Sequence, residues 1–107
     1  MKVIEDATLF AHPTTGPNHW LEHYRSPHMS VGTYSIPIGG IDDQTPHREE
    51  EIYVVVGGRA RLVVENRSVP VHTGSVVQVA ADEEHHFEDI EEDLTLLVIF
   101  APPYSGA

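Results

Sequence analysis

Four chemically active side chains stand at alternate positions in the middle of the chain. His47, Glu49, Glu51 and Tyr53 lead into a run of β-branched residues. If this stretch is extended, all four side chains point to one face of a strand. Burying two carboxylates and an imidazole without partners would cost several kcal/mol for each group, about as much as breaking a buried ion pair. The pattern therefore predicts a compensating group at this face, which is water, a protein partner or a cation.

The separation of His47 and Glu51 limits which of these side chains can share one ion. In a straight strand the two positions lie about 13 Å apart, at roughly 3.3 Å per residue. Spacing alone therefore favours His47 with Glu49. Pairing His47 with Glu51 requires a turn or bulge at Arg48-Glu49-Glu50.

Composition restricts both the ligands and the partners. The chain has no cysteine and eight histidines, so any metal is held by nitrogen and oxygen atoms. Its net charge is −11, from six Lys and Arg against seventeen Asp and Glu. A surface so acidic repels phosphate, which argues against nucleic acid or an anionic membrane as a partner.

The length and the apolar pattern predict one domain spanning residues 1–107. No apolar run approaches the roughly 20 residues that a membrane span needs. Acidic residues follow Met1-Lys2 closely, where a signal peptide would need apolar ones, so we expect a cytoplasmic protein. Residues 1–29 are expected to hold an edge strand and a loop, residues 30–101 the core, and residues 102–107 a tail.

Short β-rich segments separated by turns dominate the rest of the chain. Residues 19–24 are the one stretch that we interpret as a turn or two of helix. Gly57-Gly58 is predicted to be the turn of a hairpin between residues 52–56 and 59–65. The remaining strands are expected at 30–37, 69–72, 75–80, 85–88 and 94–100. Seven or eight short, evenly spaced strands are typical of a sandwich or barrel.

Two segments resemble the two sequence motifs of the cupin superfamily. The first motif is Gly, five residues, His-x-His, three or four residues, Glu, six residues and Gly. It is matched from Gly39 or Gly40 through Thr45-Pro46-His47 and Glu51 to Gly58. The second is Gly, five residues, Pro-x-Gly, two residues, His, three residues and Asn. It is matched by Gly74, Ala80-Ala81-Asp82, His85 and Asp89.

The resemblance implies a set of metal ligands and a fold. Thr45 stands where many cupins have their first metal-binding histidine, which leaves His47, Glu51 and His85 as ligands. Gln44 is a candidate for the vacant position. The fold implied is an all-β, cupin-type jelly-roll barrel of two antiparallel sheets with the ligands in its mouth. Two imidazoles and a carboxylate suit Fe, Mn, Ni, Cu or Zn, and three protein ligands leave positions open for substrate.

Three functions follow from this resemblance. The first is a metal-dependent enzyme acting on a small organic molecule as a dioxygenase, isomerase, cyclase or lyase, with Glu49 or Tyr53 moving the proton. The second is a non-catalytic module that binds a small molecule. The third is a structural dimer with a vestigial site, and a homodimer is expected in every case. The expected pocket residues are Tyr34, Gln78 and Phe87.

Overall fold

The computed structural model describes residues 1–9 and 17–106. Within these ranges the chain forms six strands and one short 3-10 helix, η1 (Ala7–Leu9). The strands are β1 (His19–Arg25), β2 (Ser30–Ile36), β3 (Glu50–Val64), β4 (Arg67–His72), β5 (Val76–Val79) and β6 (His85–Ala101). No helix in the described part of the chain is long and apolar enough to cross a membrane.

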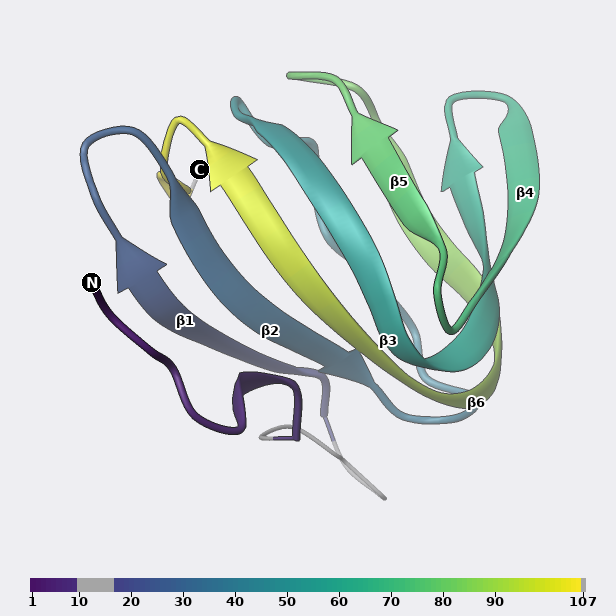
Figure 1. Ribbon diagram of the computed structural model, residues 1–107. Coiled ribbons are helices and arrows are strands. Elements are labelled where there is room, and N and C mark those ends of the chain that lie inside the picture. The colour runs from purple at the N-terminus through teal and green to yellow at the C-terminus, as the bar shows by residue number, and fades with distance from the viewer. Residues whose placement is uncertain (10–16, 107) are drawn as a thin grey trace.

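Two long strands hold the fold together. The hydrogen-bonded order is β1-β2-β6-β3-β4, and β5 pairs with β3 on the edge opposite β6, the same edge as β4. The first half of β3 pairs with β5 and with the end of β6, whereas its second half pairs with β4 and with the start of β6. Each long strand thus bends from one antiparallel layer into a second one (Figure 1). The predicted all-β fold of two antiparallel sheets is confirmed, although β1 and β4 leave the barrel open at its edges.

Gly57 and Gly58 form a bulge, so the predicted hairpin is wrong. The pairing of β3 with β6 shifts register on both sides of Gly57 and again before Arg61. The buried face of β3 changes with it, from Glu51, Tyr53 and Val55 to Ala60 and Leu62. The strand continues because β6 is long enough to pair with both of its halves.

β6 is one strand of 17 residues, where two separate strands were predicted. Its acidic middle stays in the sheet because Glu88, Glu91 and Glu92 are exposed while Ile90 is buried. Asp89 has a φ of 51°, which marks an irregularity where the buried face changes from odd to even positions.

The predicted helical turn at residues 19–24 is also wrong, because these residues form the edge strand β1. β1 pairs with β2, and its register shifts between Glu22 and Tyr24. This bulge breaks the alternation of apolar and polar residues by which a strand is recognised in a sequence. Pairing with β2 and the packing of Trp20 decide the conformation instead.

The apolar core lies on the inner faces of the sheet. Ile36, Leu62, Val79, Leu94 and Leu96 are all 0% exposed. At one end of the core, polar side chains on β3 and β6 replace the apolar ones. The candidate site is built there.

Candidate metal centre and cavity

Three buried side chains from separate segments converge at this end of the barrel. His47 precedes β3, Glu51 lies on the first half of β3, and His85 begins β6. One ligand atom from each lies within 4.8 Å of the other two. The chain bends at Arg48 and Glu49, and this bend brings His47 Nε2 to 4.0 Å from Glu51 Oε1. A turn between His47 and Glu51 was the condition for their pairing, and the structure contains it.

Glu51 is the most unusual member of the cluster. Its carboxylate is 1% exposed, and neither oxygen accepts a hydrogen bond of good geometry from the described residues. Oε1 lies 2.7 Å from His85 Nε2, which is a close ion-pair contact. Burying a carboxylate that has no donors costs several kcal/mol of folding free energy, about as much as breaking a buried ion pair. The carboxylate of Glu51 therefore requires a positive partner.

The hydrogen bonds of His85 define which of its nitrogens faces Glu51. Nδ1 lies 2.7 Å from the carbonyl oxygen of Glu83, and a carbonyl can only accept, so Nδ1 carries a proton. Nε2 then faces both Glu51 and the hydroxyl of Tyr53, which is 3.1 Å away. In a neutral ring Nε2 holds a lone pair aimed at a carboxylate. Such an arrangement calls for a proton or a metal ion between them.

Electrostatics separates the two histidines. Burial lowers the pKa of His85, but the contact with Glu51 and the hydrogen bond to Glu83 outweigh burial and leave that pKa raised. The pKa of His47 is lowered by burial, against the opposing attraction of Glu51. Burial also raises the pKa of Tyr53 well above its ordinary value. His85 thus takes up the proton that satisfies Glu51 when no metal is bound.

The donor set fits a transition-metal ion. Glu51 supplies two oxygens that have no hydrogen-bond partner among the described residues, and His85 supplies a nitrogen whose ring is oriented by a backbone carbonyl, as is common for metal-bound histidines. His47 faces the same place through Nε2. The unsatisfied buried oxygens of Glu51 are what a bound cation would explain.

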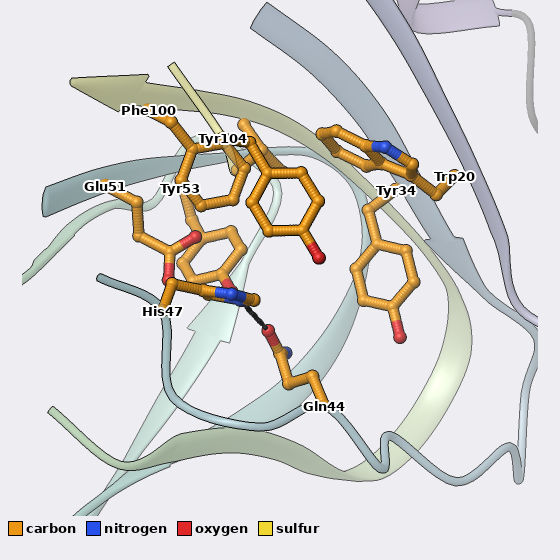
Figure 2. Close-up of a pocket in the computed structure, with 9 residues that line it drawn as sticks. Trp20, Tyr34, Gln44, His47, Glu51, Tyr53, Phe100 and Tyr104 are labelled. Carbon is orange, nitrogen blue, oxygen red and sulfur yellow. Dashed lines mark hydrogen bonds and ion pairs between the residues drawn. The ribbon is translucent and has the colours of Figure 1, made fainter. Parts of the chain in front are cut away.

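An aromatic cavity of about 200 Å3 opens beside the cluster. His47, Glu51 and Tyr53 form one side of it, and Trp20, Tyr34, Phe100 and Tyr104 form much of the rest (Figure 2). The Tyr104 ring stacks on Phe100 with a centroid distance of 4.8 Å and an interplanar angle of 20°. Away from the candidate ligands the cavity is therefore lined mainly by aromatic rings.

A comparison with protein-family models identifies the fold. Residues 32–100 match the model of the cupin domain, which covers most of the chain and all three candidate ligands. The chain belongs to the cupin family. The resemblance of its two motifs to those of cupins is thereby confirmed.

Similar proteins extend this result over nearly the full length of the cupin. An uncharacterized protein of Streptomyces coelicolor is 41% identical over 105 residues, covering 98% of this chain and 100% of the relative. An RmlC-like cupin from Desulfovibrio desulfuricans has a TM-score of 0.78 at 20% identity, with 96% and 98% of the two chains covered. The DMSP lyase DddQ from Ruegeria pomeroyi has a TM-score of 0.74 at 15% identity, covering 94% of this chain and 54% of the lyase.

Gln44 occupies the place next to the candidate ligands in this cupin. Its Oε1 lies 3.0 Å from His47 Nε2 and accepts a 3.0 Å hydrogen bond from Tyr53. Its amide nitrogen donates to the buried carboxylate of Asp42, which orients Oε1 toward the metal ligands. Thr45, at the position of the missing histidine, is exposed.

Of the three predicted pocket residues, one lines the cavity, one lies in the core and one lies on the surface. Tyr34 lines the cavity, and its hydroxyl donates a 2.9 Å hydrogen bond to Asp42. Phe87 is buried against Tyr53 in the core and does not line the cavity. Gln78 is exposed and donates to Glu50, so the structure does not bring it to the site. On β5 it is Val79 that is buried, so Gln78, the neighbouring residue, faces outward.

Glu49 is buried without lining the cavity. It is 3% exposed, and its Oε1 accepts no hydrogen bond from the described residues. The bend at residues 48–49 removes it from the face that it would share with Glu51 in a straight strand. Its charge acts on His47, whose pKa it raises against the effect of burial.

Sequence reasoning missed most of the aromatic wall. Trp20 lies on a strand that was taken for a helix, and Tyr104 lies in the tail after β6. The backbone N–H of Tyr104 donates to Ser30, and Arg25 donates to its carbonyl oxygen, so the tail is fastened over the cavity. No sequence pattern connects positions 20 and 104. The one available signal was that the chain has a single Trp and few other aromatic residues.

Proposed function

We propose that this cupin is a metal-dependent enzyme acting on a small organic substrate. His47, Glu51 and His85 would hold one divalent transition metal. The observation that carries the proposal is Glu51, a carboxylate 1% exposed between two imidazoles, whose oxygens have no hydrogen-bond partner of good geometry in the described part of the chain. At 15% identity, the likeness to a lyase concerns the fold alone, so the proposal depends on the site itself.

The donor set suits Fe, Mn, Ni, Cu or Zn. A metal in this place would supply Lewis-acid polarisation of a substrate oxygen, or activation of oxygen in the case of iron. Three protein ligands leave room for substrate, and Gln44 Oε1 is placed to complete the set as a fourth ligand. Asp42 would keep that oxygen pointed inward by holding the amide nitrogen of Gln44.

Tyr53 is our candidate for hydrogen-bond donation to the substrate. Its hydroxyl lines the cavity and lies near both Gln44 and His85. Because burial keeps its pKa well above the ordinary value, Tyr53 stays protonated and would donate rather than accept a proton. Glu49 does not reach the cavity, so we assign it to His47 as a charge that favours the ring's orientation.

A non-catalytic binding module is the alternative. The observation in its favour is that the Tyr53 hydroxyl and Gln44 Oε1 already satisfy one another. No carboxylate other than Glu51 lines the cavity among the described residues, so a general base is not evident there. A binding module would retain its ligand unchanged, whereas an enzyme would convert it.

Metal content per chain tests the proposal. We expect near-stoichiometric metal in the wild-type protein by elemental analysis and loss of most of it in His47→Ala and His85→Ala. His86→Ala is the matched control, because His86 is the next residue but lies on the outside near Glu88. Wild-type protein that binds no metal after incubation with each of the five candidate ions, while all variants stay folded, would refute the metal site.

The choice of metal separates the reaction types. A dioxygenase would work with Fe(II) and consume oxygen, and would be inactive with Zn(II). An isomerase, cyclase or lyase would tolerate Zn(II) and need no oxygen. Oxygen uptake and product analysis with the Fe(II) and Zn(II) forms therefore distinguish these enzymes, and ligand recovered unchanged from both forms favours the binding module.

A further inference from the structure

We infer that the cavity selects small, uncharged, flat ligands that bind the metal through oxygen, and that it disfavours carboxylic acids. The inference rests on the proposed metal site and adds the chemical class of its substrate. Three observations carry it: the positions of the basic residues, the buried carboxylates around the ligands, and the aromatic walls.

No lysine or arginine lines the cavity to balance an anionic substrate. The whole chain has six Lys and Arg, and none lines the cavity. These six are Lys2, Arg25, Arg48, Arg59, Arg61 and Arg67. Arg25 contacts the tail that covers the cavity, but its guanidinium is engaged by Glu22 and by the carbonyl oxygen of Tyr104. Enzymes and binding proteins that recognise carboxylates usually supply such a guanidinium or ammonium group.

The buried charge around the site is negative. Glu51, Glu49 and Asp42 are 1%, 3% and 7% exposed, and the charges of all three act on His47. Three ionised carboxylates carry one negative charge more than a divalent cation neutralises. An incoming carboxylate would meet like charge in a site of low dielectric, whereas an uncharged ligand would not.

Aromatic rings make the rest of the cavity a slot for a flat body. Tyr104 stacks on Phe100 and meets Trp20 edge-on at a centroid distance of 5.9 Å. Figure 2 shows the Tyr104 hydroxyl directed into the space beside His47 and Gln44. A volume of about 200 Å3 is below the several hundred Å3 of pockets for drug-sized ligands, so one small ring fills the space.

Three oxygen chelators test the inference on Co(II)-loaded protein, whose visible absorption reports binding at the metal. Acetohydroxamic acid is small, is uncharged in solution and binds a metal as a monoanion after it releases its proton to the buffer. Oxalate is of similar size but a dianion, and benzohydroxamic acid adds an aromatic ring to the hydroxamate. Each affinity is divided by the affinity of the same chelator for free Co(II) in the same buffer. This ratio removes the chelator's own affinity for Co(II) and so measures how much the surrounding protein strengthens or weakens its binding.

We expect the ratio for oxalate to be at least about tenfold below that for acetohydroxamic acid, because of charge repulsion. We expect the ratio for benzohydroxamic acid to be about tenfold above it, through ring contacts in the cavity. An oxalate ratio equal to or above that of acetohydroxamic acid would overturn the charge argument. Equal ratios for the two hydroxamic acids would overturn the aromatic one. Protein that takes up no Co(II) would instead contradict the proposed metal site, so the two failures are distinguishable.

Tyr104→Ala locates the aromatic contribution. This variant should lose most of the gain of benzohydroxamic over acetohydroxamic acid while it keeps its Co(II). Tyr24→Ala is the matched control, because Tyr24 lies near Lys2 and does not line the cavity. An unchanged gain in Tyr104→Ala, or an equal loss in both variants, would contradict the assignment of the slot.

Discussion

Glu51 shows how one side chain can define a site. In the metal-free protein its nearest positive partner is the ring of His85, at 2.7 Å. That contact satisfies the carboxylate only while His85 is protonated. Metal binding would release this proton and replace one cation by another, which couples the site to pH.

Replacing Glu51 by Gln should abolish tight metal binding while the barrel stays folded. The change keeps the size of the side chain and removes its charge, so metal affinity should fall at least about a hundredfold, more than the loss of an outer-shell partner costs. Elemental analysis after dialysis measures the loss. Glu50→Gln is the control, because Glu50 is exposed and hydrogen-bonded to Gln78. Metal retained in the Glu51 variant would remove Glu51 from the ligand set.

Metal affinity should fall in two stages as the pH is lowered. Both imidazoles must be neutral to bind metal. His85, whose pKa is raised, competes for a proton already above pH 6.5, whereas His47, whose pKa is lowered by burial, does so only below that value. The logarithm of the apparent affinity should therefore first fall by about one unit per pH unit, and by about two at lower pH. Competition titrations with a chelating dye from pH 8 to pH 5 measure this slope; a slope of two throughout would show that the histidines titrate together.

At the scale of the elements, the bend of β3 decides the geometry of the site. The bulge at Gly57 and Gly58 lets β3 serve both layers and so places Glu51 and His85 face to face. Gly58 has a φ of 96°, and a Cβ there would lie 2.3 Å from the carbonyl oxygen of Asp93. The position therefore requires glycine for both conformation and space.

Gly58→Ala should destabilise the protein by about 2–4 kcal/mol through strain and the clash with β6. Gly74→Ala is the matched control: its φ is 100°, but a Cβ there meets no atom within 4 Å. Its cost should be about 1–2 kcal/mol, from the left-handed conformation alone. Urea denaturation of the two variants measures the difference. Equal losses would show that the close approach of Asp93 is relieved without cost.

At the scale of the whole molecule, metal binding should stabilise the fold. His85 is distant in the sequence from His47 and Glu51, so an ion that binds all three only in the native state adds to the free energy of unfolding. At a free concentration of about 100 times Kd the gain is about 2.7 kcal/mol. A domain near 100 residues should then melt about 10–20 °C higher.

Thermal unfolding with and without the metal tests this coupling. Removal of the ion by a chelator should reverse the shift, and His85→Ala should show almost none of it. A shift of the same size in His85→Ala would place the stabilising ion elsewhere on this acidic molecule.

The sequence by itself determined the fold and the identity of the candidate ligands. Short β-rich segments predicted an all-β fold, and the resemblance to the two cupin motifs supplied His47, Glu51 and His85, the cluster that the structure contains. Alternation along a strand by itself favoured His47 with Glu49, because it assumes a straight chain between positions 47 and 51. The same alternation placed Tyr53 on the face of Glu51, and both side chains are buried.

The tertiary structure alone decided what surrounds those ligands. The bend at residues 48–49, the bulge at Gly57-Gly58 and the edge strand β1 depend on pairing with strands distant in the sequence, which local propensity does not encode. The cavity has the same origin. Trp20 and Tyr104 come from opposite ends of the chain and meet at 5.9 Å because β1 and the tail after β6 both cover the same end of the barrel. Contacts between residues so far apart follow from the packing of the whole sheet.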